Sequence, residues 1–240
     1  FQVSGSSLAI MFSGLALPNI NLVVGPDGWR AGWMLLGCLS VLGAVFAGVV
    51  LRDRPEDQGL EPAGASDDPV ATTGVCGHPG TRTVAHLSTI YFFFGMTYSV
   101  YLTFMVTSLV EDRGLSEVTA GQFWSTLGLM TLMSGPLFGF LSDRYGRRQA
   151  LASAFAIYST AYALAAVDGG TNSQWASVAA FGVAGWSIPA ILGAAVGDYA
   201  GPRNAVRILG TITVAFSLGQ VTGPALGGLL AEWTNSFAPG

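Results

Sequence analysis

The amino-acid sequence predicts an all-α integral membrane protein with seven transmembrane helices. Only 10% of its 240 residues are charged, whereas about 25% is usual in soluble domains. The charges are also clustered, and they leave seven charge-free windows that are each long enough to cross a bilayer, which takes about 20 helical residues. A soluble helical protein would show polar stripes at a 3.6-residue period, and these windows show none. The windows are residues 1–26, 31–51, 83–110, 118–142, 149–167, 169–197 and 208–231.

The arginines predict the orientation, because the chain contains no lysine. If successive windows alternate in direction, Arg30 and Arg113 fall on one side of the membrane and all other arginines on the opposite side. The positive-inside rule makes the arginine-rich side cytoplasmic. We therefore expect residue 1 in the cytoplasm and residue 240 outside, in a multi-pass protein of the plasma or inner membrane. The arginines on the cytoplasmic side are Arg52, Arg54, Arg82, Arg144, Arg147, Arg148, Arg203 and Arg207.

Residues 52–83 separate the first two windows from the other five. This stretch contains four prolines and five glycines, a composition typical of a flexible linker. We expect it to lie in the cytoplasm between two membrane units. Cys76 and His78 fall within it, but two potential ligands without a second pair do not indicate a metal site. No metal is expected.

The last window contains small residues at a regular spacing. Gly219, Gly223 and Gly227 recur every four residues, so they lie on one helix face, where a neighbouring backbone can approach closely. Pro224 is expected to bend this helix, because proline removes a backbone donor. Pro18 in the first window precedes a tryptophan near the end of that window, as Pro224 does in the last window. This weak internal repeat is consistent with a protein built from two related halves, although small residues at such spacing are common in any membrane bundle.

The stretch GFLSDRYGRRQ, residues 139–149, gathers an acid and three arginines between two windows. Asp143 ends its predicted helix at the C-terminal side, where a negative charge is unfavourable. Either an adjacent arginine or the N-terminus of another helix would compensate it. We expect Asp143 to cap the start of the first window, near residues 1–5, and so to act in a gate. The predicted gating loop consists of Gly139, Asp143, Arg144, Gly146, Arg147 and Arg148.

The pattern G-x-L-S-D-R-x-G-R-R closely resembles the signature loop of the major facilitator superfamily, which follows the second helix of each six-helix half. The resemblance implies that the seven windows are helices five to eleven of twelve. Residues 1–51 are then the last two helices of the N-terminal half-bundle, and residues 52–83 are the central cytoplasmic loop. Residues 84–240 are the C-terminal half-bundle, with five helices present and the last one missing. The run WSIPAILGAAVGD, residues 186–198, resembles the YbfB-like branch of this family.

The resemblance implies secondary active or facilitated transport of a small organic solute by alternating access. The expected partners are this solute, the lipid bilayer and the missing N-terminal helices of the same protein, with no nucleic acid and no cofactor. The fragment interpretation agrees with a chain that opens on Phe1 without the basic segment of a signal peptide. The alternative is a seven-helix receptor or sensor without transport. An enzyme is the least expected class, because the windows do not group acids, histidines and nucleophiles.

Aromatic and polar side chains within the windows suggest where solute binds. In the third window, Tyr91, Tyr98 and Tyr101 share one helix face. In the superfamily, the seventh, eighth, tenth and eleventh helices provide most of the cavity of the C-terminal half, and these correspond to the third, fourth, sixth and seventh windows. The alternative for any single aromatic residue is packing or an interfacial position. The predicted cavity residues are Tyr91, Tyr98, Tyr101, Gln122, Trp186 and Gln220.

Overall fold

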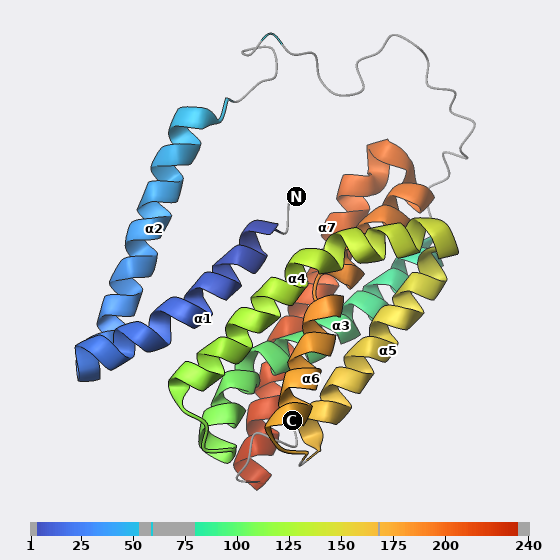
Figure 1. Cartoon of the computed structure of the whole chain (residues 1–240). Helices are drawn as coiled ribbons and strands as arrows, with labels where there is room; N and C mark the ends of the chain where they lie inside the picture. The colour runs from blue at the N-terminus through green and yellow to red at the C-terminus, as the bar shows by residue number, and fades with distance from the viewer. Residues whose placement is uncertain (1–3, 53–58, 60–79, 168, 235–240) are drawn as a thin grey trace. The chain divides into compact units, whose positions relative to one another are not determined.

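The computed structural model describes residues 4–52, 59, 80–167 and 169–234. All regular elements in this part of the chain are helical, which confirms the predicted all-α class (Figure 1). Two of them are short: η1 is a 3₁₀ turn, and η3 is a turn of π-helix. The elements are α1 (Ser4–Val24), η1 (Gly25–Asp27), α2 (Gly28–Val50), α3 (Thr81–Thr107), η3 (Ser108–Asp112), α4 (Glu117–Tyr145), α5 (Arg147–Ala166), α6 (Gly170–Ala184) and α7 (Ser187–Thr234).

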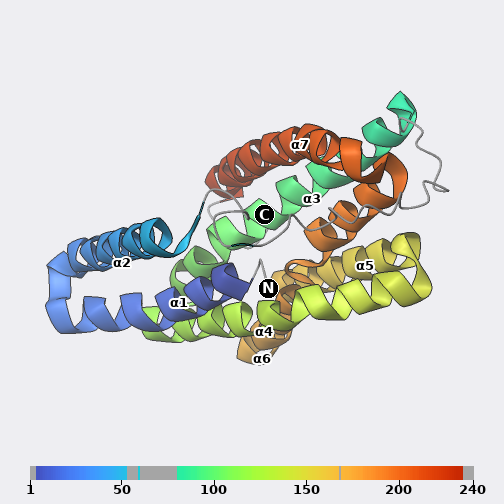
Figure 2. The ribbon, with the colours of Figure 1, turned by 90° about the horizontal axis from the view of Figure 1, so that it is seen from above.

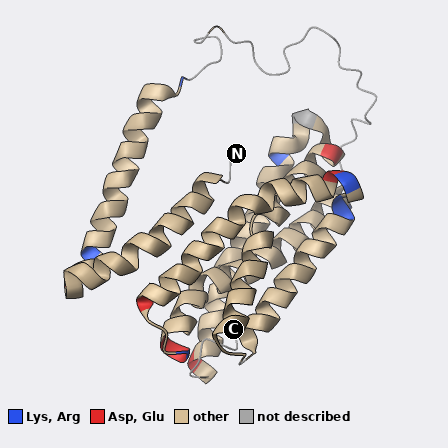
Figure 3. Cartoon of the chain, in the orientation of Figure 1, with Lys and Arg blue, Asp and Glu red and all other residues tan. Residues whose placement is uncertain are grey.

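Five helical stretches of the described chain are long and apolar enough to cross a membrane: Ser4–Val50, Thr81–Asp112, Glu117–Tyr145, Gly170–Gly201 and Asn204–Thr234. The first of them contains the first two predicted windows, which η1 separates. The predicted span 149–167 forms α5. This helix is not among the five stretches, and its hydroxyl-bearing residues lower its hydropathy. Charged residues stand near the ends of helices or, in α7, near its internal interruption at Gly201 (Figure 3).

The sixth predicted window is not one continuous helix. It contains α6 and the first part of α7, and the regular helical hydrogen bonds are interrupted between them at Gly185 and Trp186, although Gly185 keeps helical dihedral angles. A second interruption follows within α7 at Gly201, which has φ 66°. Glycine adopts this left-handed conformation without the steric cost that a side chain brings. The part of α7 after Gly201 is the last predicted span.

The chain forms two compact units, one of Asn19–Cys76 and the other of Phe1–Pro18 with Gly77–Gly240. Within the smaller unit, Gly28 lies against Asn21, and a Cβ atom at Gly28 would be only 2.5 Å from the Asn21 Cα atom. The predicted linker, residues 52–83, falls almost entirely outside the described residues. The division into half-bundles at this linker stays a prediction.

Within the larger unit, α3 and the second part of α7 lie side by side (Figures 1 and 2). Their backbones approach at the glycines of α7, because a Cβ atom at Gly219 would overlap the Phe92 carbonyl oxygen, and one at Gly223 the Met96 carbonyl oxygen. Gly227 faces the Phe104 ring at the same interface. The predicted close-packing face is therefore confirmed, with α3 as the neighbour. The bend at Pro224 stays a prediction.

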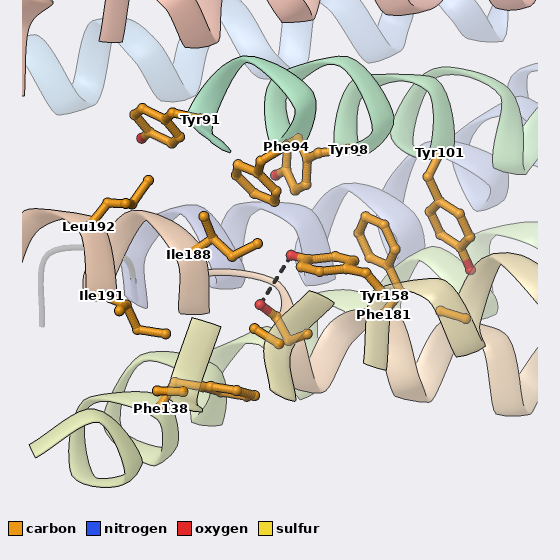
Figure 4. Packing of buried hydrophobic residues seen from close by; sticks show 14 of the residues in the cluster. Tyr91, Phe94, Tyr98, Tyr101, Phe138, Tyr158, Phe181, Ile188, Ile191 and Leu192 are labelled. Atoms are coloured by element: carbon orange, nitrogen blue, oxygen red, sulfur yellow. Dashed lines mark hydrogen bonds between the residues drawn. The ribbon is translucent and has the colours of Figure 1, made fainter. Parts of the chain in front are cut away.

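Aromatic side chains fill the interior between α3, α5 and α6 (Figure 4). The Phe181 ring lies at the centre of this cluster, with its centroid 3.9 Å from that of Tyr101 and 5.0 Å from that of Tyr158. Phe94 and Phe181 are almost completely buried. Such packing contributes dispersion energy that lipid tails do not replace equally well, and it fixes the positions of these three helices.

Candidate functional site

The loop between α4 and α5 is a tight turn at Gly146. This residue has φ 92°, which confirms the predicted positive value and explains why glycine occupies the position. Its N–H donates to the Ser142 carbonyl oxygen (3.0 Å), and its own carbonyl oxygen accepts from the Ala150 N–H (3.2 Å). The turn therefore satisfies backbone groups at the end of α4 and at the start of α5, and it sets Arg147 beside Asp143.

Arg147 is the centre of a charged cluster at this turn. Its Nη1 atom donates to Asp143 Oδ1 (2.6 Å) and Ser142 Oγ (2.7 Å), and its Nε atom donates to Asp198 Oδ2 (2.8 Å). Asp198 belongs to the first part of α7, so one guanidinium group joins α4, α5 and α7. The hydrogen bond to Asp198 is the main cause that raises the pKa of Arg147 above its ordinary value. The guanidinium group therefore stays charged throughout the physiological range.

The expected contact between Asp143 and residues 1–5 stays a prediction, because residues 1–3 lie outside the described residues. Ser7 of α1 lies beside Thr131 in the middle of α4, with 2.9 Å between their hydroxyl oxygens. Asp143 stands twelve residues further along α4, which corresponds to about 18 Å at 1.5 Å per residue. Within the described residues, the Asp143 carboxylate pairs with Arg147, which is the local alternative that the sequence left open. Arg144 is placed over the Tyr145 ring, 5.8 Å from its centroid.

Asp198 is the functional candidate that the motif did not predict. The signature pattern ends at Arg148, and Asp198 follows it by fifty residues. A signal was nevertheless present, because strict alternation of the windows places the end of residues 169–197 on the same side of the membrane as residues 139–149. Asp198 is the first charged residue after that window.

The three predicted cavity tyrosines lie on the buried face of α3. The Tyr101 hydroxyl is 2.8 Å from Ser177 Oγ of α6, and the Tyr91 ring stacks on Phe216 with 4.6 Å between centroids. Tyr98 lies between Phe181 and Trp186, at 5.8 Å and 6.2 Å from their ring centroids. All three side chains therefore pack within the bundle, and their contact with solute stays a prediction.

The other three predicted cavity residues lie on different helices. Gln122 on α4 and Gln220 on α7 are exposed, and their contact with solute stays a prediction. Trp186 is half-buried, and its indole N–H donates to Ser7 Oγ (3.1 Å). The structure thus brings Tyr98 and Trp186 together and leaves both glutamines outside the aromatic cluster.

The structure contains a cavity of about 600 Å³ between α3, α5, α6 and the second part of α7, which was not predicted from the sequence. Its wall includes Val100, Phe104 and Leu226, and Tyr101 is the one predicted cavity residue that contributes to it. Gln174 stands at one end, close to Arg113, whose Nη2 atom donates to the Ala165 carbonyl oxygen (2.7 Å). Four separate segments form this wall, so no local pattern could reveal it.

Comparison with known proteins identifies the family. The family model described as "Uncharacterised MFS-type transporter YbfB" matches residues 2–240. The chain belongs to the major facilitator superfamily. It is therefore a multi-pass membrane protein of a transporter family, which confirms the resemblance of the signature loop and favours transport over a receptor or an enzyme.

Curated relatives from bacteria and animals match about half of the chain. The chain is 32% identical to the class C tetracycline resistance protein of Escherichia coli, over 52% of the chain and 32% of the relative. It is 33% identical to major facilitator superfamily domain-containing protein 10 of Bos taurus, over 52% of the chain and 27% of the relative. It is 29% identical to solute carrier family 67 member A1 of Homo sapiens, over 53% and 31%. The matched part thus spans about a third of these relatives.

Proposed function

We propose that the chain is part of a secondary transporter that moves a small organic solute across the cell membrane by alternating access. Membership of the major facilitator superfamily supports transport, and the Arg147 cluster supports a gate. This cluster joins the ends of α4, α5 and the first part of α7 through one guanidinium group. A charged hydrogen bond that exists in only one conformation biases the equilibrium between conformations by its own strength.

The loop of residues 139–148 is the proposed gating loop, on the cytoplasmic side according to the arginine distribution. The two acids that pair with Arg147 are largely exposed, with 72% of the Asp143 side chain and 56% of the Asp198 side chain accessible. Exposed ion pairs are individually weak, at about 0.2–1 kcal/mol. Such a weak contact can be broken and remade in each transport cycle, whereas a strong one would trap a single conformation.

The solute is proposed to be an amphipathic organic molecule with ring groups. Two considerations support this class. Several relatives are named as tetracycline resistance proteins, and the exposed faces around Gln122 and Gln220 offer amides, with no charged group in the windows that contain them. An amide can donate and accept hydrogen bonds, which suits a neutral polar group on such a molecule.

Drug accumulation in cells tests this function. The full-length protein and its Arg147→Gln variant are expressed in a bacterial strain that lacks its own efflux pumps, and the cellular concentration of tetracycline is measured. Arg82→Gln is the matched control, because it removes the same charge from an exposed arginine at the start of α3, outside the gating loop. We expect the unmodified protein and the control to change accumulation equally, and Arg147→Gln to lose most of the effect. Equal activity of all three proteins at equal membrane abundance would contradict the gating role.

A further inference from the structure

Helix α1 packs closely against α4 through small residues. A Cβ atom at Gly121 would overlap the Gly14 carbonyl oxygen, and one at Gly128 would lie 2.5 Å from the Met11 nitrogen and 2.8 Å from the Ser7 carbonyl oxygen. Ser125 Oγ also donates to the Met11 carbonyl oxygen (3.0 Å). The two backbones are therefore in direct contact from Ser7 to Gly14.

The interruption between α6 and α7 lies inside the bundle, and side chains satisfy its backbone groups. The Trp186 backbone N–H donates to Ser134 Oγ of α4 (2.8 Å). The Tyr158 hydroxyl of α5 lies 3.0 Å from the Ala184 carbonyl oxygen (dashed line at Tyr158 in Figure 4) and 2.9 Å from that of Gly185. Breaks of this kind are tolerated at membrane depth because neighbouring groups pair the freed backbone atoms.

A single hydroxyl group connects α1 to this interruption. Ser7 Oγ accepts from the Trp186 indole Nε1–H (3.1 Å) and lies 2.9 Å from Thr131 Oγ1. Thr131 also packs on the interruption itself, because a Cβ atom at Gly185 would overlap its methyl group. Ser7 is fully buried. The Trp186 side chain therefore belongs to the place where α6 ends, and the Thr131 side chain touches it.

We propose that Ser7 and Trp186 couple the packing of α1 on α4 to the shape of the interruption between α6 and α7. While α1 lies on α4, the Ser7 hydroxyl holds the indole and with it the angle at Gly185. When α1 moves away, Trp186 loses this bond, and the interruption becomes free to change its angle. Ser7 and Trp186 are thus positioning residues that act through the backbone of α6 and α7. The inference rests on the proposed function, since alternating access is the motion that would separate α1 from α4.

The chain provides a matched control for this coupling. Trp124 of α4 donates its indole N–H to Ser13 Oγ of α1 (3.3 Å). This bond is also an indole N–H donated to a serine hydroxyl of α1, but it comes from α4, and neither residue belongs to the interruption. Ser13→Ala therefore weakens the α1–α4 contact alone, whereas Ser7→Ala removes the connection to the interruption as well. Both substitutions delete one hydroxyl group and keep the helix.

Hydrogen–deuterium exchange of the full-length protein in lipid nanodiscs measures the effect. The peptide that covers residues 184–190 contains the Trp186 amide. We expect Ser7→Ala to accelerate exchange in this peptide by roughly 2-fold to 10-fold, the value of one neutral hydrogen bond. Trp186→Phe should give a similar rise after correction for sequence. The double variant should give no more than Ser7→Ala alone, because Ser7→Ala already removes the bond that Trp186→Phe removes.

Three results would overturn the coupling. Unchanged exchange at residues 184–190 in Ser7→Ala would show that the hydroxyl does not hold the interruption. An equal rise in Ser13→Ala would show that any loosening of α1 has the same effect. Additive effects in the double variant would show that the residues act independently. Exchange requires no solute, so a failure of the accumulation assay concerns the proposed function, and a failure here concerns the coupling.

Discussion

The close approach of α3 and α7 predicts opposite effects for two alanine substitutions in the same helix. In Gly223→Ala, the new methyl group would overlap the Met96 carbonyl oxygen and lie 2.9 Å from Ser99 Oγ. In Gly228→Ala, the nearest atom outside the local helix is Phe104 Cζ, at an ordinary contact distance of 3.9 Å. The first substitution must push the helices apart, and the second need not.

The magnitude follows from two opposing terms. Overpacking of a tight interface costs about 1–3 kcal/mol, while replacing glycine by alanine within a helix gains about 0.5–1 kcal/mol. We therefore expect Gly223→Ala to lower the free energy of unfolding by up to about 2.5 kcal/mol, and to be about 1–3 kcal/mol less stable than Gly228→Ala. Gly228→Ala should be neutral or slightly stabilising, because it gains the helix propensity of alanine without overpacking the interface.

Reversible unfolding of the purified full-length protein in mixed detergent micelles measures both values. Loss of stability in Gly223→Ala, with none in Gly228→Ala, is the expected result. Equal stability of the two variants would refute the argument, because it would mean that the backbones of α3 and α7 do not meet at Gly223.

Three further predictions follow from other contacts. Tyr158→Phe removes the hydroxyl that pairs with the Ala184 and Gly185 carbonyl oxygens, and we expect it to lower the free energy of unfolding by about 1–3 kcal/mol in the same assay, while Tyr145→Phe, an exposed change, should have no effect. Tyr98→Ala and Gln220→Ala should each reduce tetracycline export in the full-length protein with insertion intact, and unchanged export in both would assign them to packing alone. Neutralising Glu111 or Glu232, which stand at helix ends, should leave any proton dependence of transport unchanged, because a relay needs ionisable groups within the membrane; its loss in vesicle assays would show a relay in this part of the chain.

Much of the fold could be predicted because the bilayer imposes a simple rule on composition. A charged residue inside it costs at least about 2.5–3.5 kcal/mol, so Arg30, Arg113 and the charges around Asp143 mark helix ends. A glycine at a tight turn is also informative, because it predicts a positive φ, and Gly146 has a positive φ. The spacing of Gly219, Gly223 and Gly227 identified a packing face, although not the helix that occupies it.

The partners across helices could not be predicted, since they depend on how far each helix extends past its neighbour. Asp143 had two candidate partners in the sequence, an adjacent arginine or the start of α1. Deciding between them requires the register of α1 against α4, which Gly14, Gly121 and Gly128 set. A sequence motif does not specify how two helices are aligned against each other. The interruption at Gly185 could not be predicted either, because a charge-free apolar window has the same composition whether its helix is continuous or broken.

The most direct test of alternating access is the accessibility of an exposed position on α7 from both sides of the membrane. Gln220 is replaced by cysteine in a cysteine-free version of the full-length protein, and an impermeant thiol reagent is applied to right-side-out and to inside-out vesicles. A cysteine at Ser66, in the predicted cytoplasmic linker, serves as the control for orientation. The proposed function predicts labelling of position 220 from both sides and of position 66 in inside-out vesicles alone. Labelling of position 220 from one side only, or from neither, would contradict alternating access, and labelling of position 66 from outside would reverse the orientation.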